Sequence, residues 1–210
     1  MPDLLTTGPA DGPGLLLAHG AGAAMDSRWM DDMAARLSAR GIRVIRFEFA
    51  YMAARRTGSR PPVPRADRVL DEYRAAWLQA GRPALIGGKS YGGRVASMVA
   101  DSLAPEGLRG LVCLGYPFHP PGRPERLRTA HLEHLATPAL ICQGERDPMG
   151  TTADVAGYRL APTIELSWAP DGDHDLRPRK ALSGRTHAQN LDAAADAVAE
   201  FARTTGSQRS

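Results

Sequence analysis

Short apolar runs alternate with amphipathic stretches along most of this 210-residue chain. Runs of mostly apolar residues bounded by glycine or proline predict buried strands, whereas apolar residues three or four positions apart predict helices that bury one face. A weaker apolar pattern at residues 3–7 indicates one further strand at an edge of the sheet. The six clearer predicted strands are residues 15–18, 42–49, 84–88, 111–115, 138–143 and 163–168.

Apolar residues at helical spacing occupy most of the intervals between these strands. The first helix begins after Asp26 or Ser27, either of which can cap it, and ends at Gly41. Residues 57–64 and 116–137 are rich in proline or glycine and are predicted to be irregular. The predicted helices are residues 27–40, 69–80, 91–103, 151–160 and 191–202.

Strands that alternate with helices are typical of a parallel sheet with helices on both faces. The predicted fold is therefore a three-layer α/β/α sandwich with about six parallel strands. We expect one domain over residues 1–203 and a disordered tail over residues 204–210. The irregular segment 116–137 is too short and too proline-rich for a helical cap, so we expect no cap domain.

Composition narrows the class of protein further. Hydrophobic residues make up 43% of the chain, as in an ordinary globular domain, and runs such as residues 15–18 are too short to span a bilayer. Residues 1–7 lack the pattern of a signal peptide. The arginines are scattered, so the net charge of +3 does not indicate a nucleic-acid groove. We expect a cytoplasmic protein with no membrane or nucleic-acid partner, while the oligomeric state stays open.

Both cysteines lie inside predicted strands. Cys113 and Cys142 are surrounded by apolar residues in the sequence. A disulfide between them is one interpretation, and the one we favour is a pair of buried, reduced thiols in a cytoplasmic chain.

Ser90 lies in the run Gly88-Lys89-Ser90-Tyr91-Gly92, between a predicted strand and a predicted helix. The G-x-S-x-G motif places a nucleophilic serine on a strained turn, and its glycines let strand and helix pass close together. The helix N-terminus presents backbone N–H groups to developing negative charge. A phosphate-binding P-loop is the competing interpretation, but it requires glycine where this chain has Pro83. Ser90 is therefore the candidate nucleophile.

A second glycine-rich run, His19-Gly20-Ala21-Gly22, follows the first strong strand. Such a loop can supply one backbone N–H to an oxyanion hole, and the residue after the nucleophile supplies the other. The candidate donors are the N–H groups of Ala21 and Tyr91. A plain glycine turn is the alternative, and His19 itself is interpreted as structural.

Candidate partners for Ser90 follow two later strands. Asp147 ends the run Gly144-Glu145-Arg146-Asp147, and Glu145 is its local rival for the role of orienting acid. His174 lies in an acidic loop after the last strand and is the candidate general base. No second histidine is spaced for a metal site with His174, and the chemistry implies no metal or cofactor. The catalytic hypothesis is thus Ser90, His174 and Asp147.

These runs resemble the α/β-hydrolase superfamily, near its dienelactone-hydrolase-like members. More closely, the chain is similar to a small lidless bacterial family related to a testis-expressed protein and to a subunit of the non-specific-lethal chromatin complex. Tyr91 stands where that family usually has methionine. The resemblance covers residues 15–180 and implies the fold and the triad in the chain order Ser90, Asp147, His174. The matching runs are residues 18–22, 46–49, 87–94, 114–119, 143–147, 171–175 and 178–180.

Hydrolysis of a small carboxylic ester or thioester is the function that these motifs favour. The main alternative is a non-catalytic binding or scaffold protein, which the chromatin relative implies. A perhydrolase or haloperoxidase activity would use the same three residues.

Charged residues add two expectations about the site. Arg46 and Glu48 alternate on one predicted strand, so we expect them to form an internal ion pair, with Lys89 as a further partner. Other basic residues fall in the motif loops. If they face the site they favour an anionic substrate, and the alternative is that they are surface charges paired with acids. These residues are Lys89, Arg94, Arg123, Arg146, Arg179 and Lys180.

Overall fold

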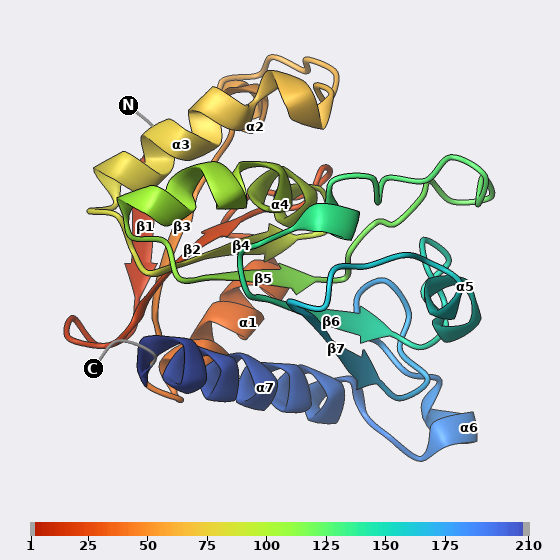
Figure 1. Ribbon diagram of the computed structural model, residues 1–210. Coiled ribbons are helices and arrows are strands. Elements are labelled where there is room, and N and C mark those ends of the chain that lie inside the picture. Colours follow the sequence, from red (N-terminus) through yellow and green to blue (C-terminus); the bar gives the residue numbers. More distant parts are fainter. Residues whose placement is uncertain (1–2, 208–210) are drawn as a thin grey trace.

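A seven-stranded sheet separates two layers of helices in the computed structural model, which describes residues 3–207 (Figure 1). The strand order is β1-β3-β2-β4-β5-β6-β7, and β1 alone runs antiparallel to its neighbour. The predicted sandwich with six parallel strands is confirmed, and the weak pattern at residues 3–7 forms β1. The strands are β1 (Leu4–Thr7), β2 (Gly14–Ala18), β3 (Arg43–Phe47), β4 (Leu85–Lys89), β5 (Gly110–Leu114), β6 (Ala139–Gly144) and β7 (Ile164–Ala169).

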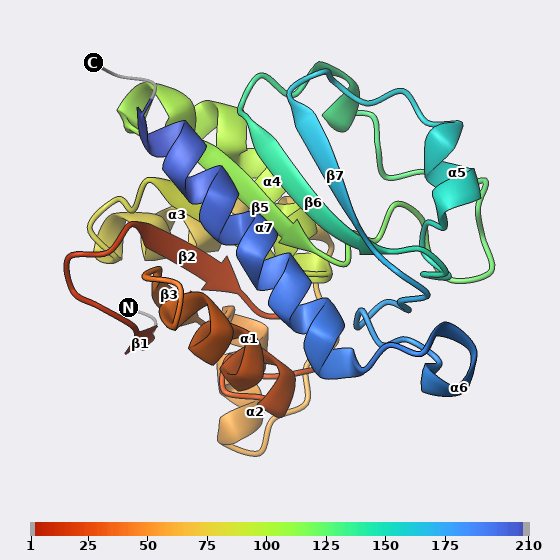
Figure 2. The same cartoon turned by 90° about the horizontal axis from the view of Figure 1, so that it is seen from below.

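Helices cover both faces of the sheet. In Figure 1, α3 and α4 lie above the sheet and α1 and α7 lie below it, and Figure 2 shows α1 and α7 from their own side. Single turns of 3-10 helix occur at Ala66–Arg68, Ala104–Glu106 and Leu132–His134. The α-helices are α1 (Arg28–Ser38), α2 (Ala50–Arg56), α3 (Leu70–Gln79), α4 (Tyr91–Leu103), α5 (Thr152–Ala156), α6 (Lys180–Ser183) and α7 (His187–Ser207).

Alternate residues of each central strand enter different cores. Leu16, Ile86 and Cys113 belong to the core beneath α3 and α4, whereas Leu17 and Cys142 belong to the core beneath α1 and α7. This alternation follows from the period of two along a strand, and it explains why the central strands have no polar face and carry polar side chains only near their carboxyl ends, at Lys89 and Gln143. Cys113 and Cys142 therefore lie on opposite faces of the sheet, and both are free and buried.

Four helices differ from the sequence pattern, and one of them, the four-residue α6, was not predicted. Helix α2 lies where no helix is predicted, although Ala50–Arg56 consists mostly of strong helix formers and buries Tyr51 and Met52. Helix α5 ends at Ala156 because Gly157 follows, four residues before the predicted end. Helix α7 continues to Ser207, past the boundary predicted at residue 203, and residues 208–210 lie outside the described residues.

Arg46 and Glu48 are both buried at the end of β3, but they do not pair with each other. The Nη1 atom of Arg46 lies 2.6 Å from Asp31 Oδ1, on α1. Both carboxylate oxygens of Glu48 accept hydrogen bonds of 2.7 Å from Arg56, on α2. The predicted mutual ion pair is therefore wrong. The two helices beside the strand supply opposite charges, which a pattern within the strand cannot show.

The carboxyl ends of the parallel strands carry no helical cap in the part of the chain that the structure describes. Between β5 and β6 the chain is irregular except for the single turn at Leu132–His134. This segment extends beyond the strand ends in Figure 1. None of the helices described in residues 3–207 is long and apolar enough to cross a membrane.

Candidate active site

Ser90 forms the turn between β4 and α4 in a strained backbone conformation. Its φ is 52° and its ψ is −113°, values that non-glycine residues rarely adopt. A Cβ atom on Gly88 would lie 2.3 Å from the Gly92 carbonyl carbon, and one on Gly92 would lie 2.6 Å from the His19 oxygen. Only glycine fits at these two positions, which is the physical reason for the motif.

Ser90, His174 and Asp147 lie together at the carboxyl ends of β4, β7 and β6. The Ser90 Oγ atom is 2.7 Å from His174 Nε2, and His174 Nδ1 is 2.7 Å from Asp147 Oδ2. Because an ionised carboxylate only accepts hydrogen bonds, Nδ1 is the donor to Asp147. In the neutral imidazole, Nε2 is then the acceptor for the serine hydroxyl. This arrangement can remove the hydroxyl proton of Ser90.

The carboxylate of Asp147 is fully buried and held by two further donors. The side-chain amide of Gln143, on β6, donates to Oδ2 at 2.8 Å, and the backbone N–H of Met149 donates to Oδ1 at 2.8 Å. Gln143 also accepts from the Tyr116 N–H and donates to the Gly150 carbonyl. These bonds connect the loop of Asp147 to the ends of β5 and β6.

The acids that follow β6 and β7 beside Asp147 and His174 have different partners. Glu145 accepts a hydrogen bond of 2.8 Å from the backbone N–H of Asp171. Asp173 accepts from the backbone N–H groups of Asp175 and Arg177, both at 2.9 Å. Both acids therefore brace the loop that carries His174, and Asp147 is the acid that contacts the imidazole.

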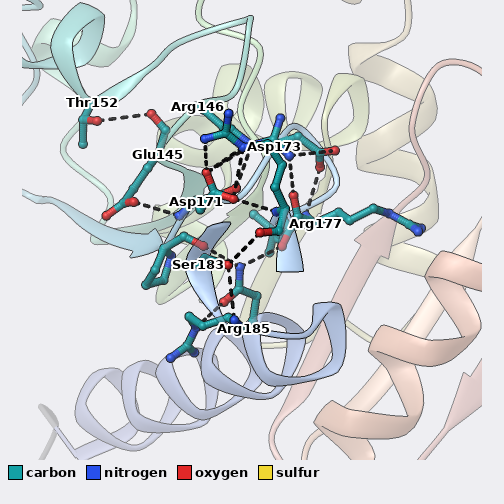
Figure 3. A network of polar contacts seen from close by, with 12 residues as sticks. Glu145, Arg146, Thr152, Asp171, Asp173, Arg177, Ser183 and Arg185 are labelled. Atoms are coloured by element: carbon teal, nitrogen blue, oxygen red, sulfur yellow. Dashed lines mark hydrogen bonds and ion pairs between the residues drawn. The ribbon is translucent and has the colours of Figure 1, made fainter. Parts of the chain in front are cut away.

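A network of polar contacts surrounds this loop (Figure 3). Arg146 donates to the carbonyls of Asp171 and Arg177, both at 2.8 Å. Arg179 forms an ion pair with Asp171, and its hydrogen bonds lower the pKa of that carboxyl. Arg146 and Arg179 are thus bonded within the loop, as the surface-charge interpretation expects.

Lys89 connects the serine turn to the histidine loop. Its buried Nζ atom donates to the His174 carbonyl at 2.8 Å and lies 3.1 Å from Asp175 Oδ1. Burial lowers the pKa of Lys89, and Asp175 opposes this effect. The ammonium also lies 5.3 Å from the centre of the Trp29 ring. The predicted contact of Lys89 with Arg46 and Glu48 is wrong. Lys89 ends β4 and not β3, and its partner is Asp175, in the loop after β7.

The two expected oxyanion donors border the same cleft as Ser90. The N–H of Tyr91 is in the first turn of α4, where the helix supplies no acceptor. The carbonyl of Ala21 accepts a hydrogen bond of 3.2 Å from the Tyr51 hydroxyl, which holds the glycine-rich loop in place. His19 is fully buried and accepts from the Phe49 N–H through Nε2 at 3.2 Å, so it has a structural role.

Ser90 borders two clefts. One, of about 510 Å³, lies beside α4 and the segment 63–67 and includes Arg94 and Arg128. The other, of about 470 Å³, lies beside α1 and includes Trp29, Lys89 and His174. A substrate with its carbonyl at Ser90 has room for a group on each side.

Sequence reasoning missed the positioning contacts of Gln143, Lys89 and Tyr51. Gln143 is a polar residue at the end of an apolar run, which is a usable signal. Lys89 lies inside the recognised motif, but its partner Asp175 is 86 positions away. Tyr51 belongs to the helix that the pattern did not reveal.

Comparisons with known proteins agree with this architecture. The sequence model of a family described as "Alpha/beta hydrolase domain" matches residues 11–203. A dienelactone hydrolase from Anabaena variabilis is 20% identical, with a TM-score of 0.70 over 96% of this chain and 90% of that chain. An a/b serine hydrolase without lid from Xanthomonas campestris is 20% identical, with a TM-score of 0.69 over 95% and 89%. An esterase domain from Rhodothermus marinus is 17% identical, with a TM-score of 0.63 over 95% and 91%.

Proposed function

The chain belongs to the alpha/beta hydrolase domain family, and we propose that it is a serine hydrolase that cleaves carboxylic ester or thioester bonds of a small substrate. One observation carries this proposal: the hydrogen-bonded series from Ser90 through His174 to the buried Asp147. The esterase domain and the dienelactone hydrolase among the structural neighbours support ester chemistry in general.

In the proposed reaction, the Ser90 Oγ atom attacks the carbonyl carbon while His174 Nε2 takes the hydroxyl proton. Collapse of the tetrahedral intermediate breaks the bond to the alcohol or thiol, which receives that proton from His174. Water then attacks the acyl-enzyme, His174 takes a proton from it, and Ser90 leaves with the proton restored. Asp147 keeps the imidazole in the required tautomer and stabilises its charged form. No cofactor takes part in the proposed steps.

The negative charge on the carbonyl oxygen needs donors that are already in place. We assign this role to the backbone N–H groups of Ala21 and Tyr91. The dipole of the 13-residue α4 adds to the effect, because its N-terminus begins at the serine turn. The Tyr51 hydroxyl acts as a positioning group through the Ala21 carbonyl.

A non-catalytic binding or scaffold protein is the second candidate, as the resemblance to the chromatin-complex subunit implies. The strained φ of Ser90 argues for catalysis, because such strain costs about 1–3 kcal/mol and a scaffold has no physical need to keep it. For the same chain we propose a cytoplasmic location, which its two buried, free cysteines support.

A panel of small esters and thioesters tests the proposal, with the Ser90→Ala variant as the control. We expect turnover of at least one substrate by the parent protein. Loss of the nucleophile should reduce kcat by a factor on the order of 10⁶, to the background rate. Turnover by Ser90→Ala within tenfold of the parent, in a clean preparation of folded protein, would contradict the mechanism.

A further inference from the structure

Two arginines border the cleft beside Ser90 without an acidic partner. Arg94 lies one helical turn after Ser90 on α4, and Arg128 lies in the segment between β5 and β6. Within residues 3–207, no carboxylate lies within 4.0 Å of either guanidinium. Asp67 also borders the cleft, but its carboxylate is bonded to Arg65.

The surroundings of these guanidinium groups lack compensating charge. The Nε atom of Arg94 is buried and has no hydrogen-bond partner in the described chain. Burial lowers the pKa of Arg128, and the nearby positive charge of Arg94 lowers it further. Charged groups that lose water are normally paired, because an unpaired buried charge is costly. Two half-buried like charges in one cleft therefore favour the binding of an anion from outside the chain.

Other basic residues near the site are not available to bind an external anion. Lys89 is paired with Asp175, and Arg146 and Arg179 are bonded to the loop of Asp171. Arg123 is exposed and does not border the cleft. Arg28 borders the other cleft, but its side chain is exposed to solvent, whereas Arg94 and Arg128 are half-buried. The unpaired positive charge that has lost part of its water thus lies on one side of Ser90.

We propose that Arg94 and Arg128 form an anion subsite, and that the hydrolase acts on esters or thioesters bearing a carboxylate or phosphate group. This inference rests on the proposed function and names its substrate class. Guanidinium groups bind both kinds of anion through paired N–H donors. Four residues of α-helix rise about 6 Å, so an anion held by Arg94 lies a few bonds from a carbonyl at Ser90.

The backbone of the subsite is held in place independently of substrate. The Arg94 N–H donates to the Ser90 carbonyl at 3.0 Å, within α4. The Arg128 N–H donates to the Phe118 carbonyl at 2.8 Å, and the Tyr116 hydroxyl donates to the Arg128 carbonyl at 3.3 Å. Only the two side chains need to adjust when an anion binds.

Anion binding tests the subsite without any need for turnover. Succinate and inorganic phosphate are titrated separately into the parent protein at low ionic strength and followed by NMR. We expect saturable binding of at least one anion, weakened about tenfold or more in Arg94→Gln and in Arg128→Gln. The Arg123→Gln variant removes an exposed arginine from the same segment and should bind like the parent. No saturable binding, or equal binding by all variants, would overturn the subsite.

Matched esters then test the substrate class. Mono-4-nitrophenyl adipate and 4-nitrophenyl hexanoate differ by a carboxylate on the acyl group, and 4-acetoxybenzoate and phenyl acetate by one on the leaving group. In at least one pair, the ratio of kcat/KM (carboxylated over neutral) should fall about tenfold or more in Arg94→Gln and Arg128→Gln but not in Arg123→Gln.

Each outcome separates this inference from the proposed function. Hydrolysis with unchanged ratios in both arginine variants would overturn the substrate class and leave the hydrolase assignment standing. No hydrolysis of any ester or thioester would contradict the hydrolase assignment, while the titration still decides whether the subsite exists. Thermal melting verifies that each variant folds. If Arg94→Gln does not fold, the result for Arg128→Gln alone decides whether the anion subsite exists.

Discussion

Gln143 and Met149 set the orientation of the Asp147 carboxylate before any substrate is present. The amide of Gln143 donates to Asp147 Oδ2, the same oxygen that accepts from His174. Because Asp147 has no exposure to solvent, its carboxylate depends on these donors for stabilisation. A change at Gln143 should therefore affect the imidazole without touching the substrate.

We predict that Gln143→Met lowers kcat about 10- to 100-fold with a smaller change in KM. The thioether cannot donate to Asp147, so the carboxylate loses a hydrogen bond of about 1.5–3 kcal/mol that helps to place it. Steady-state kinetics on an ester that the parent hydrolyses provides the measurement, with circular dichroism to verify the fold. An unchanged kcat in a folded variant would contradict the role of Gln143 in positioning Asp147.

For single residues, the sequence predicts catalytic roles better than it predicts the partners of charged side chains. The strand–turn–helix context identifies Ser90, and the loops after two later strands identify Asp147 and His174. The partners of Lys89, Arg46 and Glu48 could not be predicted, because each is supplied by a different element. An ion pair depends on which elements pack together in the fold, whereas a motif depends on the local geometry of one stretch of backbone.

The segment between β5 and β6 forms one wall of the arginine-lined cleft. His131 lies at its inner side, where Nε2 is 2.8 Å from Ser97 Oγ and 3.3 Å from the Tyr116 hydroxyl. Burial, reinforced by the charge of Arg94, lowers the pKa of His131 to about 4, while Asp101 opposes this. The sequence does not predict this burial, since the proline-rich surroundings of His131 show no helical or strand periodicity.

The stability of this segment should depend on pH through His131. Its pKa is lower in the folded chain than the ordinary 6.5, so between about pH 4 and 6.5 the unfolded chain takes up a proton that the folded chain does not. The free energy of unfolding therefore falls as the pH falls through this window. In His131→Gln the free energy of unfolding should depend less steeply on pH, and the difference should correspond to at most about one proton taken up on unfolding.

Urea unfolding between pH 4 and 7 measures this slope. His134→Gln removes an exposed histidine from the same segment and should keep the slope of the parent. Equal slopes for His131→Gln and the parent would show that His131 is not held neutral by its surroundings.

Elements with strong periodicity were predicted, whereas short elements were predicted only weakly, as β1 was, or not at all, as α2 and α6 were. Helices α1, α3, α4 and α7 carry apolar stripes, and all four were predicted. The bounds of α1, α3 and α4 agree with the prediction within two residues, whereas α7 spans 187–207 against a predicted 191–202. Helix α2 has seven residues, too few for a clear period, and its burial comes from the core beneath α3 and α4. The edge strand β1 has four residues and is stabilised by its pairing with β3.

At the scale of the whole molecule, the open carboxyl edge of the sheet limits the apolar surface offered to a substrate. Both clefts at Ser90 are bordered by polar or charged groups as well as apolar ones. Each buried methylene would contribute about 0.8 kcal/mol to binding. Because no helical cap covers the site, most methylenes of a long acyl chain stay in water.

We therefore predict that kcat/KM changes by less than about tenfold between butyryl and dodecanoyl esters of one alcohol. Full burial of the eight additional methylenes would instead raise kcat/KM by a factor on the order of 10⁴. Initial rates below the micellar concentration of each ester give the comparison. A steep rise toward long neutral chains would contradict both the open site and the preference for anionic substrates.

If Ser90 is a nucleophile activated by His174, a fluorophosphonate should label it covalently. The Ser90 oxygen should displace fluoride and form a phosphonyl ester, which mass spectrometry locates in the peptide containing residues 88–94. We expect one label per chain, no label in Ser90→Ala, and a rate lowered at least about 100-fold in His174→Ala. Folded parent protein that stays unlabelled, or a label that persists in Ser90→Ala, would contradict the account.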